Sequence, residues 1–164
     1  MVFTFERLFA FLRRFRHEPT PYERALRALG EGRHADALAQ LEQLLATLPS
    51  NDKRRLTVEN KRGVALVYLG RKDEAQSQFE AILASDAVYV PAIVNLGNMA
   101  LESGNFEEAV KRYEAAVNID DFYPGAHYNL GVAYKRLGRT GDAVRELRRA
   151  TNLEGRAPRN QSTY

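Results

Sequence analysis

The tripeptide Asn-Leu-Gly occurs at residues 95–97 and again 34 residues later, at residues 129–131. Residues downstream correspond at the same offset, and the pairs are Gly104 with Gly138, Ala109 with Ala143, Tyr113 with Leu147, and Ala116 with Ala150. A period of this length is typical of stacked helical hairpins, in which each repeat buries its apolar face against its neighbours. The sequence therefore predicts an all-α repeat array.

Composition is consistent with such an array and argues against several other classes. The chain has 164 residues, of which 45% are hydrophobic and 27% charged, as expected for one globular domain. It contains no cysteine, which excludes disulfides, thiolate metal sites and cysteine nucleophiles. No apolar run approaches the roughly 18 residues of a membrane span, and no export signal is evident. We therefore expect a cytoplasmic protein held together by packing alone.

Four units of 34 residues account for residues 18–157 if four extra residues follow the first unit. After the last unit, residues 158–164 are expected to form a disordered tail, and arginines on the last helix are expected to keep that helix soluble. The extra residues are expected to lengthen the first helix of the second unit. The predicted units are 18–51, 56–89, 90–123 and 124–157.

Local signals mark where helices begin and how closely they approach. Thr20, Pro21 and Glu23 form a capping-box pattern that starts the first helix. Pro91 and Pro124 lie at two later helix starts, where the missing N–H of proline removes no hydrogen bond. Small residues recur in each unit and are expected to let the paired helices approach closely.

Residues 1–17 differ in kind from the repeats. On a helical projection they are amphipathic, with apolar and basic faces. The face residues are Phe5, Leu8, Phe9, Phe11, Leu12 and Phe15 on the apolar side, and Arg7, Arg13 and Arg14 on the basic side. Such a helix is typical of an anionic membrane interface, but it also suits a cap on the first repeat or an element that docks on a partner. A poorly ordered arm is a further alternative.

The pattern of large and small residues resembles the tetratricopeptide repeat (TPR) family. In this family, the first helix of each hairpin has Leu followed by Gly near its start, and a further Gly lies at the turn. The second helix then has a large residue between two alanines. In the third unit these residues are Leu96, Gly97, Gly104, Ala109, Tyr113 and Ala116. The resemblance covers residues 18 to about 155 and is strongest in the third and fourth units. It implies a right-handed superhelical array of four hairpins, an α-solenoid, whose concave face is lined by the first helix of each pair.

The resemblance also implies which side chains line that concave groove. They are Asn60, Val64 and Tyr68 from the second unit, Val94, Asn95, Asn98 and Glu102 from the third, and Tyr128, Asn129, Val132 and Arg136 from the fourth. We expect Asn95 and Asn129 to matter most, because an amide offers both donors and an acceptor to an extended peptide backbone. That these asparagines only cap or solvate the helix surface stays an alternative.

Chaperone adaptors of this family hold a carboxylate with Lys and Arg side chains. In this sequence Gly125 and Asn129 occupy two of those cationic positions, which disfavours a chaperone-tail clamp. The apolar residues among the predicted groove positions favour a more apolar ligand.

No known catalytic or cofactor motif is present. The sequence lacks a glycine-rich phosphate loop, a G-x-S-x-G elbow and an H-E-x-x-H pair. We expect His127 to be a packing residue, and Asp120 and Asp121 to form a solvated turn rather than a metal site. Basic residues gather near the C-terminus without interleaved aromatics, so nucleic-acid binding is disfavoured.

The sequence thus predicts a non-enzymatic scaffold or adaptor that binds a peptide or helix of a partner protein, with no cofactor and no metal. Two alternatives remain. One is a peripheral membrane-associated assembly factor localised by residues 1–17. The other is a self-associating scaffold, in which exposed end faces build a homo-oligomer.

Overall fold

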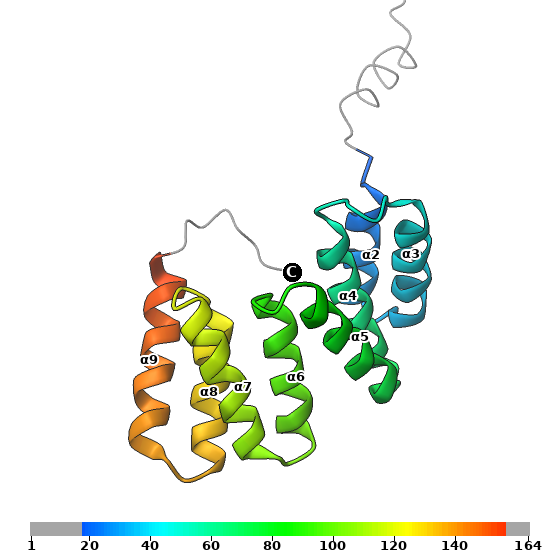
Figure 1. The fold of residues 1–164 in the computed structure, drawn as a ribbon. Helices are drawn as coiled ribbons and strands as arrows, with labels where there is room; N and C mark the ends of the chain where they lie inside the picture. The colour runs from blue at the N-terminus through cyan, green and yellow to red at the C-terminus, as the bar shows by residue number, and fades with distance from the viewer. Residues whose placement is uncertain (1–17, 157–164) are drawn as a thin grey trace, which may run out of the picture.

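The computed structural model describes residues 18–156, and these form eight α-helices and no strand (Figure 1). The helices are α2 (Pro21–Gly30), α3 (His34–Thr47), α4 (Arg55–Tyr68), α5 (Lys72–Ser85), α6 (Val90–Glu102), α7 (Phe106–Ile119), α8 (Pro124–Arg136) and α9 (Thr140–Arg156). The predicted amphipathic helix of residues 1–17 and the predicted tail of residues 158–164 lie outside the described residues. The all-helical fold predicted from the repeats is confirmed.

Successive helices pair as hairpins through a turn that requires glycine. Gly32, Gly70, Gly104 and Gly138 each lie between the two helices of a pair and adopt φ values from 73° to 79°. Side chains other than glycine rarely adopt this left-handed conformation, so the glycines end the first helix of each pair. Their regular recurrence in the sequence reflects this backbone requirement.

Glycine also permits the close approach of the two helices within a pair. A Cβ atom built on Gly97 would lie 2.6 Å from Cε1 of Tyr113, and one on Gly63 would lie 2.5 Å from Cε1 of Phe79. Both aromatic rings are fully buried. The predicted close contact between small and large residues is confirmed in these two hairpins.

The first helices of the pairs form one continuous inner row. Helix α4 contacts α2 and α6, and α6 also contacts α8, whereas no such contacts join the second helices α3, α5, α7 and α9 to one another within residues 18–156. A row whose members touch on one side and separate on the other must curve. We call the side formed by α2, α4, α6 and α8 the inner face.

The buried core divides near the connection between α5 and α6. One cluster is formed by α2–α5 and extends to Ala92 and Leu96 of α6, and the other is formed by α6–α9. Leu83 of α5 packs against both clusters. In Figure 1, α2–α5 accordingly lie together on one side of the array and α6–α9 on the other.

The start of α2 confirms the predicted capping box. Thr20 Oγ1 accepts a hydrogen bond from the Glu23 N–H at 3.2 Å, and the Glu23 carboxylate accepts one from the Thr20 N–H at 2.7 Å. This reciprocal pair satisfies two backbone donors that the helix leaves unpaired.

The prediction that residues 52–55 lengthen a helix is wrong. Helix α4 begins at Arg55, and the preceding three residues belong to the loop after α3. Asp52 fixes this loop, because its carboxylate accepts hydrogen bonds from the Arg54 backbone N–H at 2.8 Å and from the Arg54 guanidinium at 2.7 Å and 3.0 Å. Side-chain bonds to a nearby backbone compete with helix formation.

Candidate binding surface on the inner face

Hydrogen bonds between asparagines join neighbouring first helices on the inner face. The Asn95 amide of α6 donates to Asn60 Oδ1 of α4 at 2.9 Å, and the Asn129 amide of α8 donates to Asn98 Oδ1 of α6 at 2.9 Å. Four of the predicted groove residues are therefore brought together in two pairs. The structure places the donors of Asn95 and Asn129 in contacts between repeats.

Asn98 is further held by a side chain from the second helix of its own hairpin. The Tyr113 hydroxyl donates to Asn98 Oδ1 at 2.7 Å. Burial, together with the nearby Glu102 carboxylate, raises the pKa of Tyr113, so its hydroxyl stays protonated and keeps this donor role. One amide oxygen thus accepts from two directions, which fixes the orientation of the Asn98 side chain.

Two predicted groove residues at the end of their helices make contacts across repeats. Tyr68 of α4 stacks on His34 of α3, with ring centroids 4.4 Å apart and an interplanar angle of 7°. Glu102 of α6 forms an ion pair with Lys72 of α5 at 3.4 Å. These pairs occupy equivalent repeat positions, so the same location joins neighbouring hairpins by different chemistry.

The remaining predicted groove residues differ in accessibility. Val94 is 6% exposed and belongs to the core, whereas Val64 and Val132 are half-buried. Tyr128 is 54% exposed, and Arg136 near the end of α8 is also exposed. Asn60 is also 6% exposed, so its side chain is buried beneath the pair that it forms with Asn95. The part of the inner face that a ligand can contact is therefore concentrated on α8 and on the half-buried asparagines of α6 and α8.

One inner-face residue was missed in the sequence. Lys61 stands at the repeat position of Asn95 and Asn129 and is partly buried, which lowers the pKa of its ammonium group. Alignment of the second unit with the third would have found it.

His127 is buried, as predicted for a packing residue, and both ring nitrogens are engaged. Nδ1 lies 2.9 Å from Glu146 Oε2 of α9, and Nε2 lies 3.0 Å from the Asp121 carbonyl oxygen. The Asp121 carboxylate also pairs with Arg149. This network ties α8 and its preceding loop to α9. No group of acidic, histidine or cysteine side chains within residues 18–156 has an arrangement that could hold a metal ion.

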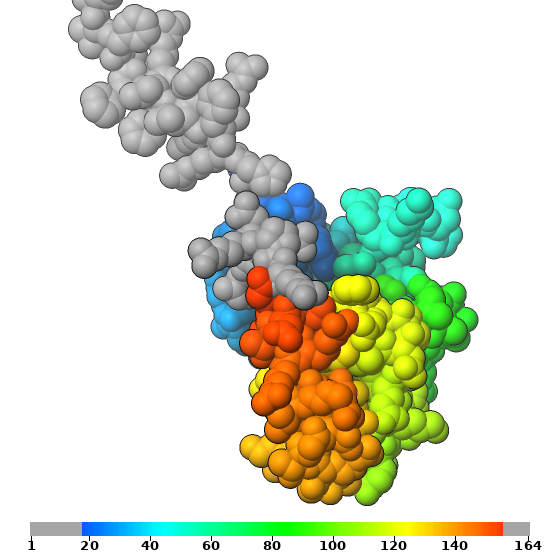
Figure 2. Space-filling view, turned by 90° about the vertical axis from the view of Figure 1, so that its left-hand side faces the viewer, coloured from blue at the N-terminus to red at the C-terminus, as the bar shows by residue number. Residues whose placement is uncertain are grey.

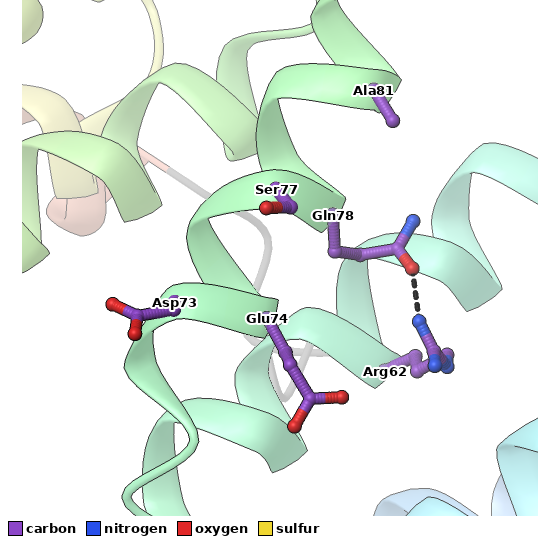
Figure 3. A pocket seen from close by; sticks show the side chains of 6 residues that line it. All are labelled: Arg62, Asp73, Glu74, Ser77, Gln78 and Ala81. Carbon is purple, nitrogen blue, oxygen red and sulfur yellow. Dashed lines mark hydrogen bonds between the residues drawn. The ribbon is translucent and has the colours of Figure 1, made fainter.

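An open depression of about 410 Å³ lies beside α5 (Figure 3). Its wall from α4 is Arg62, which points toward Gln78 and donates a hydrogen bond to it (Figure 3). Arg62 also pairs with Glu42 of α3 at 3.2 Å. Glu74, another lining residue, pairs with Arg71 outside the depression, so three of its polar side chains already have partners. No helix within the described chain is both long enough and apolar enough to span a membrane.

Comparison with known families agrees with this geometry. A family model described as TPR repeat matches residues 97–138, and one described as Tetratricopeptide repeat matches residues 124–156. Residues 97–156, which form most of α6–α9, are therefore tetratricopeptide repeats, and the same hairpin geometry continues through the described residues before them. No curated protein sequence matches this chain.

Solved structures share the fold at low sequence identity. A crystal structure of MamA is 21% identical, with a TM-score of 0.63 over 82% of this chain and 77% of that chain. The 41-end form of MamA from Desulfovibrio magneticus RS-1 is 18% identical, with a TM-score of 0.63 over 93% and 85% of the two chains. The second TPR of Spaghetti (RPAP3), bound to the HSP90 peptide SRMEEVD, is 24% identical, with a TM-score of 0.57 over 62% and 94%. These similarities concern the fold.

Proposed function

We propose that this protein is a non-enzymatic interaction scaffold that binds an extended peptide segment of a partner protein on its inner face. The observation that carries the proposal is the pairing of asparagine amides between α4, α6 and α8. An amide has two donor hydrogens and an acceptor oxygen, so one mutual bond leaves polar capacity on both partners. Because the pairing fixes each side chain, that capacity is already oriented before a ligand arrives.

The α6–α8 pair, whose two members are both half-buried, offers complementary groups to a peptide backbone, whereas Asn60 of the α4–α6 pair is only 6% exposed. In the α6–α8 pair, the oxygen of Asn98 is engaged and its amide nitrogen keeps its donors, while the amide of Asn129 donates and its oxygen can accept. An extended peptide presents unpaired backbone N–H and C=O groups, whereas those of a helix are already used. An extended ligand is therefore favoured over a helix at this surface.

Side chains beside the asparagines suggest the composition of the ligand. Tyr128 and Val132 add an exposed aromatic ring and a half-buried aliphatic group, and Arg136 adds a positive charge at the end of α8. A peptide with apolar side chains and an acidic residue near one end fits this arrangement. The Spaghetti domain that shares the fold is itself bound to a peptide with an acidic end. The predicted absence of the chaperone-clamp cations at Gly125 and Asn129 distinguishes the present surface from that use.

Replacing Asn98 by Asp gives a test that separates binding from folding. The carboxylate keeps an oxygen that accepts from Asn129 and Tyr113, but it loses the amide donors. Peptides selected from a random display library on the wild-type protein serve as probes, and affinity is measured by fluorescence anisotropy. We expect Asn98→Asp to weaken binding about tenfold or more while the thermal midpoint changes little, since a hydrogen bond is replaced by repulsion.

Asn118→Asp is the matched control, because Asn118 is exposed on α7, away from the inner face. It introduces the same charge and should leave affinity unchanged. Selected peptides that bind Asn98→Asp and Tyr128→Ala as tightly as the wild type would place the binding surface elsewhere. Failure to enrich any peptide would overturn the proposal.

Localisation through residues 1–17 is a second proposal, supported by their amphipathic sequence. Arginines opposite a Phe and Leu face favour binding to anionic lipids, with about 1 kcal/mol from each basic residue near the surface. The full chain should co-float with phosphatidylserine-containing liposomes, less so in high salt, and Phe9→Glu should abolish flotation. A wild-type protein that stays in the bottom fraction excludes this proposal without affecting the inner-face one.

A further inference from the structure

The outer side of α9 lacks the cover that its counterpart α7 receives. Val110 of α7 is 6% exposed because it lies in the core shared with α8, whereas Val144, its repeat equivalent on α9, is 43% exposed. Tyr113 is fully buried, and its equivalent Leu147 is only half-buried. Figure 2 shows α9, in orange, forming the face turned toward the viewer. No other described helix covers it.

This side contains a depression of about 380 Å³. We call it the end face, and its lining residues are Val144, Leu147, Arg148, Thr151 and Asn152. Val144, Leu147 and Thr151 recur at helical spacing and correspond to the α7 residues Val110, Tyr113 and Val117, all of which belong to or pack against the inner core. The end face therefore has the shape and spacing of a surface on which a further helix packs.

The charge of the end face differs from that of the α7 surface. Glu114 of α7 accepts a hydrogen bond of 2.5 Å from the Tyr134 hydroxyl of α8, and this bond contributes with burial to raise the pKa of Tyr134 to about 12. The repeat equivalent of Glu114 is Arg148, which is exposed and makes no ion pair within residues 18–156. The position that holds a carboxylate acceptor between α7 and α8 therefore holds a cationic donor on the end face.

We propose that the end face binds an amphipathic helix of a partner protein that carries an acidic side chain opposite Arg148. In the interface between α7 and α8, the apolar side of α8 packs against α7, and Tyr134 donates a hydrogen bond to Glu114. The partner helix would pack an apolar side over Val144 and Leu147 in the same manner and place Asp or Glu where α8 has Tyr134. This surface is separate from the inner face, so the protein would hold two partners, or two segments of one partner, simultaneously.

Charge disfavours the occupants that the chain itself could supply. A second copy stacked head to tail would place its α2 against the end face. Helix α2 carries the exposed residues Arg24 and Arg27 at the repeat positions of Leu130 and Ala133, so this arrangement would bring arginines close to Arg148. Two end faces packed against each other would bring Arg148 of both copies into one seam. Residues 1–17 are rich in arginine and would be repelled likewise.

The proposal is tested with two helical probes that differ at one residue. Both consist of residues 121–138 of this chain, cross-linked between positions 128 and 132 on the unpacked side, with Lys135→Gln and Arg136→Gln. The acidic probe carries Tyr134→Glu and the basic probe Tyr134→Lys. Titration of the fluorescently labelled probes with the full chain should show that the acidic probe binds about fivefold more tightly, the upper range for a solvent-accessible ion pair.

Two variants of the protein make the test decisive. Arg148→Glu should reverse the preference between the probes, and Val144→Glu should weaken both about tenfold or more by placing a charge in the apolar slot. Lys111→Glu, an exposed charge reversal on α7, is the matched control and should change neither affinity. Asn98→Asp should also leave probe binding intact, which keeps this test independent of the inner-face proposal.

Three results would overturn the proposal. Neither probe binding the wild type at millimolar concentration would remove the helix-binding role. A preference that persists in Arg148→Glu would remove the charge complementarity on which the partner was chosen. Sedimentation that shows a dimer of the wild type but a monomer of Val144→Glu would assign the end face to a second copy.

Discussion

In the first half of the array, α2–α5, Arg62 occupies the repeat position that Leu96 and Leu130 occupy in the second half, α6–α9. The two leucines are buried, whereas the Arg62 side chain is about a quarter exposed and reaches Glu42 of α3 and Gln78 of α5. The same place between hairpins is therefore filled by apolar packing in one half and by a polar bridge in the other. Both solutions satisfy the surrounding groups, so the helix arrangement is retained.

The two halves share the features that fix backbone geometry. Gly63 and Phe79 form the same close contact as Gly97 and Tyr113, and each turn has a glycine in the left-handed region. The residues that the family models match lie entirely in the second half. Close helix approach and turn conformation thus define the hairpin, while the side chains between hairpins vary.

Replacing the helical glycines that contact a large side chain should have the largest effect on stability, and it tests whether this close contact is equally important in the two halves. The added methyl at residue 63 or 97 would lie within 3 Å of a buried aromatic ring, so we expect Gly63→Ala and Gly97→Ala to lower the free energy of unfolding by about 2 kcal/mol. Gly131→Ala should cost about 1 kcal/mol, because the nearest neighbour of the added methyl, the half-buried Leu147, can move, although the Ala143 carbonyl oxygen at 3.1 Å cannot. Urea denaturation measures all three, and equal costs would contradict this account.

Arg62→Leu would make the first half resemble the second. Leucine removes the need to desolvate a guanidinium, and the exposed partner Glu42 regains water, so we expect stabilisation of about 1 kcal/mol. Thermal unfolding should show a higher midpoint. Lys111→Leu, at an exposed lysine of α7, is the control and should not raise it. A lower midpoint for Arg62→Leu would show that the polar bridge is needed at this position.

Tyr113→Phe would give the second half the ring that the first half has at Phe79. The Asn98–Tyr113 bond exists only in the third unit, since the corresponding residues of the second unit are Val64 and Phe79. Loss of this bond should cost about 1 kcal/mol. Asn98→Val should be less destabilising in the Tyr113→Phe background than alone, because the hydroxyl is then no longer left unpaired. A double-mutant cycle by urea denaturation measures this coupling, and strict additivity would contradict it.

Asp52→Asn should have the smallest effect, confined to the loop that the second half lacks. Hydrogen bonds from Arg54 lower the pKa of Asp52 from 3.8 to about 2. A pKa that is lower in the folded state gives stability above the unfolded value, and that stability is lost as pH falls from about 4 to about 2. The urea midpoint of Asp52→Asn should therefore lie slightly below that of the wild type at pH 7 and converge with it near pH 2. A constant difference across this range would exclude the carboxylate as the cause.

Much of the fold could be predicted because it depends on spacing. The period placed Gly104 and Gly138 at turns, Pro91 and Pro124 at helix starts, and Gly97 opposite a large residue. The loop at Asp52 was predicted incorrectly, because its hydrogen bonds to Arg54 compete with a helix that periodicity alone favoured. Counting residues showed that four were extra but not which conformation they take.

For the groove residues, the sequence indicated which side of the helix each side chain lies on but not which residue it contacts. Asn95 and Asn129 were correctly distinguished from their packed neighbours Leu96 and Leu130, but their partners Asn60 and Asn98 lie more than 30 residues away in sequence. Val94 was expected to face a ligand and lies in the core. Which amide meets which depends on the offset between neighbouring helices, a quantity that a single repeat does not contain.

The helical hairpin follows from the order of residues alone, because left-handed turns and close helix contacts depend on residues that lie near one another in each repeat. How the hairpins are joined becomes clear only in the folded molecule. Contacts such as Arg62 with Glu42, Asn95 with Asn60 and Glu102 with Lys72 depend on the stacking of one unit on the next, as does the absence of a described helix over Val144. The turns and the contacts within a hairpin recur with the repeat period and can therefore be located by counting residues. The contacts between hairpins are made by residues that differ from unit to unit, so counting does not reveal them.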